Sequence, residues 1–162
     1  MSIEIKQIFD KTEGRWLEER DADKLLTYAD GLLTGLETLQ AIERAEGRIL
    51  DDVVAAVTQR SGALSQDYGP SAALKVRRDQ AMVLRYAAFS LLLQDKSFIY
   101  DKLAVWLRTM MMALCKPEQV LGGYYSLVDA CRKHLTKADA DAVVPFIQVV
   151  IDELEQNGGK PS

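Results

Sequence analysis

The sequence contains few of the side chains that small enzymes and metalloproteins depend on. There are two cysteines and one histidine among 162 residues. Cys115 and Cys131 lack CxxC and CxxH spacing, so we expect neither a disulfide framework nor a zinc site. Both lie in apolar helical stretches, where a free buried thiol is usual. A protein of a reducing compartment is the expectation that follows.

Long hydrophobic runs and an excess of positive charge are also missing. The uncharged runs 86–94 and 142–151 are about half as long as a membrane-spanning helix requires. The N-terminus, MSIEIKQIFDKTEG, has no signal-peptide core. A formal net charge of −4 argues against bulk binding to nucleic acid or anionic membranes, although it allows a local basic patch. We therefore expect a soluble, cytoplasmic protein that is not an integral membrane protein.

Glycine and proline are sparse, and the segments between them have helical rather than strand periodicity. Gly31 and Gly35, four residues apart, favour close helix packing over a functional role. Pro145 is expected to start or kink the last helix. We predict a single all-α domain over 1–162, with a loop at 61–71 and a flexible tail at 157–162. The predicted helices cover approximately residues 2–11, 21–47, 47–60, 71–93, 95–117, 118–135 and 136–156.

Several polar and soft side chains are better explained by structure than by chemistry. His134 lies in a polar helix end with no nucleophile suggested nearby, so we expect a surface histidine. Asp51 and Asp52 are adjacent and therefore diverge on a helix, whereas acid–base catalysis needs convergent carboxylates. One of Tyr124 and Tyr125 is expected in the core, because neighbours on a helix point about 100° apart. We therefore predict no enzymatic activity and no metal site.

The stretch KVRRDQAMVLRYAAF places Arg77, Arg78 and Asp79 immediately before an apolar run of the central helix. Arginine offers a planar fork that suits carboxylates, and aspartate accepts hydrogen bonds from N–H groups. Cations are also unfavourable near a helix N-terminus, which would favour a specific partner. Two interpretations follow: a site for an anionic ligand, or a helical turn whose charges pair with neighbouring side chains.

Short motifs in register across nearly the whole chain resemble those of the phycobiliproteins, and of the allophycocyanin branch most. In that family Tyr-Gly precedes the central helix, which then carries Cys-x-Arg-Asp, Leu-Arg and a final Gly-Asp. The Arg-aromatic-Leu entry to the first long helix is similar to Arg15-Trp16-Leu17. The other matching stretches are Tyr68-Gly69, Val76-Arg77-Arg78-Asp79, Leu84-Arg85, Gln94-Asp95, Arg48-Ile49-Leu50 and the series Arg108, Leu114, Cys115, Pro117.

The resemblance implies a globin-like helical bundle with an N-terminal helical pair, residues 1–20, that serves association. It also implies a pocket for a linear tetrapyrrole (bilin) of the phycocyanobilin type. In the family the arginine that matches Arg78 pairs with a bilin propionate. The aspartate that matches Asp79 caps the inner pyrrole nitrogens.

The chain departs from the family pattern at the point of bilin attachment. The attachment cysteine is replaced by Val76, and a valine cannot form a thioether, so any bilin would be held non-covalently. Arg77 replaces a leucine and adds a cation that could take a second propionate. The glycine of Gly-Asp is Gln94, and Met111 stands where a tyrosine is expected.

The association surface departs from the family as well. The arginine that matches Arg85 meets an aspartate from the partner's N-terminal helices in the family. That aspartate falls at Lys11 here, with Asp10 beside it. We therefore expect Arg85, Asp10 and Trp16 at an interface that differs from the family's heterodimer.

Three functions remain open on the sequence. The first is a phycobilisome-related protein that binds a bilin non-covalently, in light harvesting or as a carrier or sensor. The second is a bilin-free scaffold or assembly factor of the antenna. The third, a bilin lyase or isomerase using Cys115, is the least favoured. The expected partners are phycobiliprotein-like subunits or linker proteins in a homo- or hetero-oligomer at the cytoplasmic face of the thylakoid membrane, and no nucleic acid.

Overall fold

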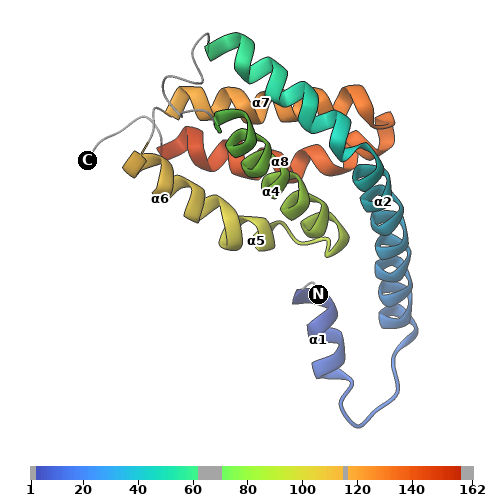
Figure 1. Cartoon of the computed structure of the whole chain (residues 1–162). Helices are drawn as coiled ribbons and strands as arrows, with labels where there is room; N and C mark the ends of the chain where they lie inside the picture. The colour runs from blue at the N-terminus through green and yellow to red at the C-terminus, as the bar shows by residue number, and fades with distance from the viewer. Residues whose placement is uncertain (1–2, 62–70, 115–116, 158–162) are drawn as a thin grey trace.

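The computed structural model of the chain describes residues 3–61, 71–114 and 117–157. This part of the chain is helical and contains no strand, which confirms the predicted all-α class. The predicted loop at 61–71, most of the tail, and Cys115 lie outside the described residues. The elements are α1 (Ile3–Lys11), α2 (Glu19–Ser61), α4 (Ala72–Leu92), α5 (Lys96–Ile99), the π-helical turn η1 (Tyr100–Ala104), α6 (Val105–Leu114), α7 (Pro117–His134) and α8 (Lys137–Asn157) (Figure 1).

The core lies where the second half of α2 packs with α4, α7 and α8. Helix α4 contacts all three of the others, so its predicted central position is confirmed. The apolar stripe of each helix faces this core, as amphipathic spacing requires. The fully buried side chains include Ile49 and Val53 of α2, Leu84 and Ala87 of α4, Leu127 of α7, and Ile147 and Ile151 of α8.

Helix α2 is continuous over 43 residues, so the predicted division into two helices at Gly47 is wrong. A glycine inside a helix costs only about 1 kcal/mol relative to alanine. Buried Ile42 and Ala45 precede Gly47, and buried Ile49 and Leu50 follow it, on a stripe that packs into the core. Their burial outweighs the poor propensity of one glycine. A Cβ atom at Gly47 would meet nothing within 4 Å, so close packing does not require glycine there.

The first half of α2 and helix α1 form an arm that extends from the body of the bundle (Figure 1). Ile5 and Ile8 of α1 are buried. The predicted close packing at Gly31 and Gly35 is confirmed. A Cβ atom at Gly35 would lie 3.3 Å from Leu92 Cα, and one at Gly31 would clash with the side chain of Gln94. The two glycines therefore hold the arm against the C-terminal end of α4.

The junction between α4 and α5 contains the one non-glycine residue with a positive φ among the described residues, Gln94, at φ 52°. Its side-chain amide donates to the carbonyl oxygen of Tyr28 in the arm at 3.2 Å. Asp95 then caps α5 by accepting from the Ser97 backbone N–H at 2.9 Å. Pro145 lies inside α8 rather than at its start. In the described part of the chain, no helix combines the length and apolarity needed to cross a membrane.

Candidate functional site

Arg77, Arg78 and Asp79 lie in the second turn of α4, because the helix begins at Ala72. This start agrees with the helix predicted over 71–93, and it places the charges beyond the first turn. The macrodipole acts mainly within the first turn, so its field at Arg77 and Arg78 is weak. The misplacement of arginine near a helix N-terminus therefore gives little support for a specific ligand, and the site has to be judged from its contacts.

Arg77 is paired within the chain. Its Nη1 lies 2.5 Å from Asp51 Oδ1 of α2, and its Nη2 lies 3.5 Å from the Gly47 carbonyl oxygen. The two charged side chains are 38% and 70% exposed, so this pair contributes at most about 1 kcal/mol to stability. For Arg77 the simpler interpretation, a charge paired to a neighbouring helix, accounts for the geometry.

Arg78 and Asp79 differ from Arg77 in having no such partner. Both residues are exposed overall, and neither side chain makes a hydrogen bond or ion pair with another described residue. Partial burial raises the pKa of the Asp79 carboxyl above its usual value, and the charge of Arg78 offsets this only in part. The ionised carboxylate is therefore held in surroundings that disfavour it.

Tyr124 of α7 and Gln80 of α4 are the buried polar residues nearest to Asp79 in contact or in sequence. Tyr124 of α7 is buried, and its pKa is raised by burial and then by the charge of Asp79. Gln80 is 4% exposed, and its Oε1 has no hydrogen-bond partner in the described structure. The Gln80 amide nitrogen lies against Gly123, where a Cβ atom would be only 2.8 Å away. No sequence pattern pointed to Gln80, because a single uncharged polar residue beside a charged motif is common.

The prediction that one of Tyr124 and Tyr125 belongs to the core is confirmed. Tyr124 is fully buried and Tyr125 is exposed. Tyr125 donates its hydroxyl hydrogen to Glu155 of α8, which raises the pKa of the phenol. Buried Tyr124 lies close enough to Asp79 for the charge of that carboxylate to act on its phenol.

Arg78 offers a cation to an anion and Asp79 offers an acceptor to N–H donors. Val76 is partly buried and packs against the core, so it offers only apolar contact. Cys131 is buried, and burial raises the pKa of its thiol to about 12, which leaves it unreactive. The predicted free buried thiol is thus confirmed for Cys131. Arg78 supplies a fork for a carboxylate, and Asp79 supplies an acceptor.

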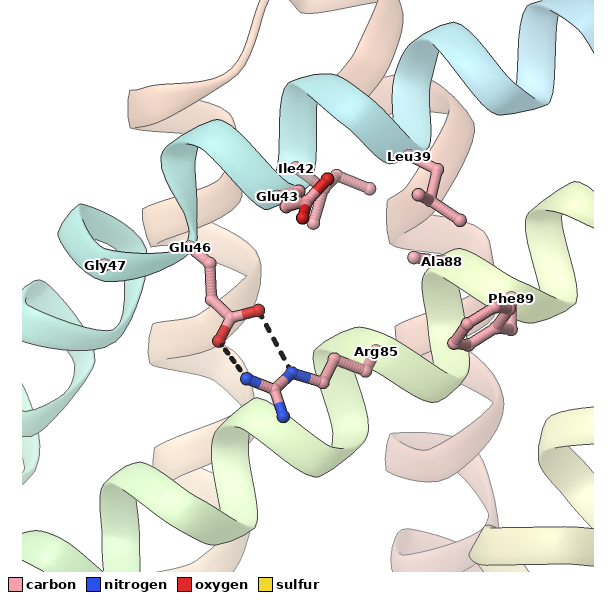
Figure 2. A pocket seen from close by; sticks show the side chains of 8 residues that line it. All are labelled: Leu39, Ile42, Glu43, Glu46, Gly47, Arg85, Ala88 and Phe89. Atoms are coloured by element: carbon pink, nitrogen blue, oxygen red, sulfur yellow. Dashed lines mark hydrogen bonds and ion pairs between the residues drawn. The ribbon is translucent and has the colours of Figure 1, made fainter.

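The predicted interface residues lie apart from Arg78 and Asp79. Arg85 makes a bidentate ion pair with Glu46 of its own α2, with Nη2–Oε1 at 2.6 Å and Nε–Oε2 at 3.1 Å (Figure 2). The pair borders a pocket of about 500 Å³ between α2 and α4. Asp10 and Trp16 are both exposed on the arm. The sequence did not reveal Glu46, because it lies 39 residues from Arg85 in the chain.

The adjacent acids diverge, as predicted, but each is engaged in an ion pair. Asp51 holds Arg77, and Asp52 Oδ2 lies 2.6 Å from Lys133 Nζ and 2.7 Å from His134 Nε2. These contacts lower the pKa of Asp52. His134 ends α7, but its side chain is only 18% exposed, so the expectation of a surface histidine needs correction. Tertiary pairing with Asp52, invisible in the local sequence, draws the ring inward.

Comparison with known proteins identifies the family. A family model described as phycobilisome protein matches residues 7–154. A search of curated proteins gave no significant match. The matched region runs from α1 to the last turn of α8, so it spans both the arm and the body of the bundle. The all-α architecture agrees with the globin-like bundle that the resemblance implied. The chain therefore belongs to the phycobilisome protein family.

Proposed function

We propose that this protein binds a linear tetrapyrrole non-covalently between α4 and α7, as an antenna component, carrier or sensor. Its place of action would be the cytoplasmic face of the thylakoid membrane, in association with phycobilisome proteins. The observation that carries this proposal is the Arg78–Asp79 pair, which has no hydrogen-bond partner in the described structure while Arg77 and Arg85 do. A bilin offers propionates to Arg78 and pyrrole N–H groups to Asp79.

The energetics of such binding are sufficient without a covalent bond. Two charge-assisted hydrogen bonds contribute about 1.5–3 kcal/mol each. Burial of conjugated ring surface adds about 25 cal/mol per Å². Micromolar affinity corresponds to about 8 kcal/mol, which these contributions can reach together. Val76 would pack against the ring where a cysteine would otherwise form a thioether.

The second candidate is a bilin-free scaffold or assembly factor of the antenna. Val76 favours it, because the residue removes the usual means of fixing a chromophore. The exposed apolar side chains of the arm, Trp16 foremost, also favour a protein that works by association. Neither candidate assigns catalysis to the chain.

The test is the visible absorption spectrum of the full chain, co-produced with the enzymes of bilin synthesis. The purified protein is then denatured in acidic urea and passed through a gel-filtration column. The proposal expects colour that purifies with the native chain and separates from it on denaturation. A covalently attached phycobiliprotein produced in the same cells verifies the bilin supply. A colourless chain beside a coloured control would overturn the proposal and leave the scaffold function.

A further inference from the structure

A second cavity, of about 530 Å³, lies where α1, the first half of α2 and the junction between α4 and α5 meet. Its volume falls within the range of small-molecule sites, about 300–1,000 Å³. Helix α1 lies alongside α2 here (Figure 1), and its buried Ile5 supplies an apolar floor. Gln94 borders the cavity from the body of the bundle. The cavity therefore shares no residue with the Arg78–Asp79 pair.

Two cations of α2 line one end of this cavity. Arg20 and Lys24 are four residues apart, so they are neighbours on one face of the helix and repel each other. The side chain of Arg20 makes no hydrogen bond or ion pair with another described residue. Asp23 is the one acidic residue of the lining, so the cavity has a net charge of +1 in a chain whose net charge is −4. An anion bound here would offset the repulsion between the two cations.

The other end of the cavity is aromatic and apolar. Tyr28 is partly buried and lies eight residues beyond Arg20, which is about 12 Å along the helix axis. The side-chain amide of Gln94 donates to the Tyr28 carbonyl oxygen at 3.2 Å and so fastens this end of the cavity to the body. The Thr27 hydroxyl is already engaged with a backbone carbonyl oxygen of its own helix, at 3.0 Å. The cations therefore remain as the strong donors available to a ligand.

We propose that this cavity binds a small organic anion. Its carboxylate is held by Arg20 and Lys24, because a guanidinium fork and an ammonium group both donate to carboxylate oxygens. Its apolar body lies between Ile5 and the ring of Tyr28. The inference goes beyond the proposed bilin site and does not depend on it.

The mixed lining separates this class of ligand from two simpler ones. An inorganic anion would use the cations but would leave Ile5 and the Tyr28 ring in contact with water. A cation would be attracted by Asp23 alone and repelled by Arg20 and Lys24. A ligand that combines a carboxylate with an apolar body uses both ends of the cavity.

The first experiment titrates the full chain with phenylbutyrate, which joins a carboxylate to an aromatic ring through a short alkyl chain. Amide chemical shifts are followed by NMR at constant ionic strength. The shifts should concentrate in the first turns of α2 and at Gln94. Butyrate lacks the ring, and phenylbutylamine carries a cation in place of the carboxylate. Each should bind at least about 10-fold more weakly, because each loses one of the two contributions.

A charge variant then tests the assignment of the carboxylate. Arg20→Ala should raise the dissociation constant of phenylbutyrate about 10- to 150-fold, which corresponds to the loss of one charge-assisted hydrogen bond. Arg44→Ala is the matched control, because Arg44 is an exposed arginine of the same helix outside the cavity, and it should leave the constant unchanged. Circular dichroism verifies that both variants keep the helical fold.

An Arg78→Ala variant keeps this result separate from the bilin hypothesis. Phenylbutyrate that also binds at Arg78 would shift amides of α4, and only those shifts should disappear in the variant. A probe that shifts no amide around the cavity would overturn the proposal. So would equally tight binding of phenylbutylamine, or an affinity for phenylbutyrate that Arg20→Ala leaves intact.

Discussion

Replacing Arg78 with alanine removes the one cation of the candidate site that no described side chain neutralises. If a bilin propionate binds Arg78, the variant leaves that propionate without its charge-assisted partner. This loss costs about 2–3 kcal/mol of binding free energy. The dissociation constant for free phycocyanobilin should therefore rise about 30- to 150-fold. The assay is an equilibrium titration of the apo chain with the bilin, followed by the red absorption band.

Arg77→Ala is the control for this experiment, because it removes an adjacent cation of the same helix. Arg77 already pairs with Asp51, and the pair is largely exposed, so its loss should lower the stability by less than about 1 kcal/mol. Bilin affinity should change little. Equal losses in the two variants would show that Arg77 leaves Asp51 to bind a second propionate. Unchanged affinity in Arg78→Ala would refute the assignment of the site.

Three other predictions concern stability and colour. Because the folded-state pKa of Asp79 is raised, its ionisation disfavours folding, and Asp79→Asn should stabilise the apo chain in thermal unfolding at neutral pH. That gain in stability should disappear below the ordinary aspartate pKa, where Asp79 is neutral in both the folded and the unfolded chain. In the same variant, the red absorption band of a bound bilin should shift. Gly31→Ala should lower the free energy of unfolding of the parent chain, because the new Cβ atom would clash with the Gln94 side-chain amide. In a Gln94→Gly background, which lacks that amide, the same substitution should cost about 1 kcal/mol less. Urea unfolding measures both, and additive effects of the two substitutions would contradict this. Arg108→Ala should cost about 2 kcal/mol in the same assay, because it removes an ion-pair partner of buried Glu153, and a neutral result would show that the pair is dispensable.

Local periodicity was enough to predict most of the helices and the central position of α4. It failed at Gly47, where it predicted a helix end. The low helix propensity of one glycine is outweighed by the burial of the apolar residues on either side of it, Ile42, Ala45, Ile49 and Leu50. A helix that would be marginal alone is continuous when its stripe packs into a core. The same reasoning explains why boundaries are harder to predict than elements.

The candidate site was predicted in composition but not in its contacts. The motif pointed to Arg77, Arg78 and Asp79 together, yet only the fold separates Arg77, which pairs with Asp51, from the other two. Asp51 lies 26 residues away, and no local pattern links such a pair. The arrangement of Tyr124 beside Asp79 is likewise a product of helix packing.

The three arginines on α4 differ in what neutralises them, and this difference separates the two possible roles of the protein. Arg77 and Arg85 each meet a carboxylate of α2, so they contribute to the bundle whether or not a ligand is present. Arg78 meets none within the described structure, and beside it the raised pKa of Asp79 shows a carboxylate whose ionised form works against folding. A ligand with N–H groups would reverse the cost at Asp79 and could place a carboxylate on Arg78, whereas a scaffold would gain nothing from either residue. Variants at Arg78 and Asp79 therefore report on a bilin, and variants at Trp16 report on association, so either role can fail without deciding the other.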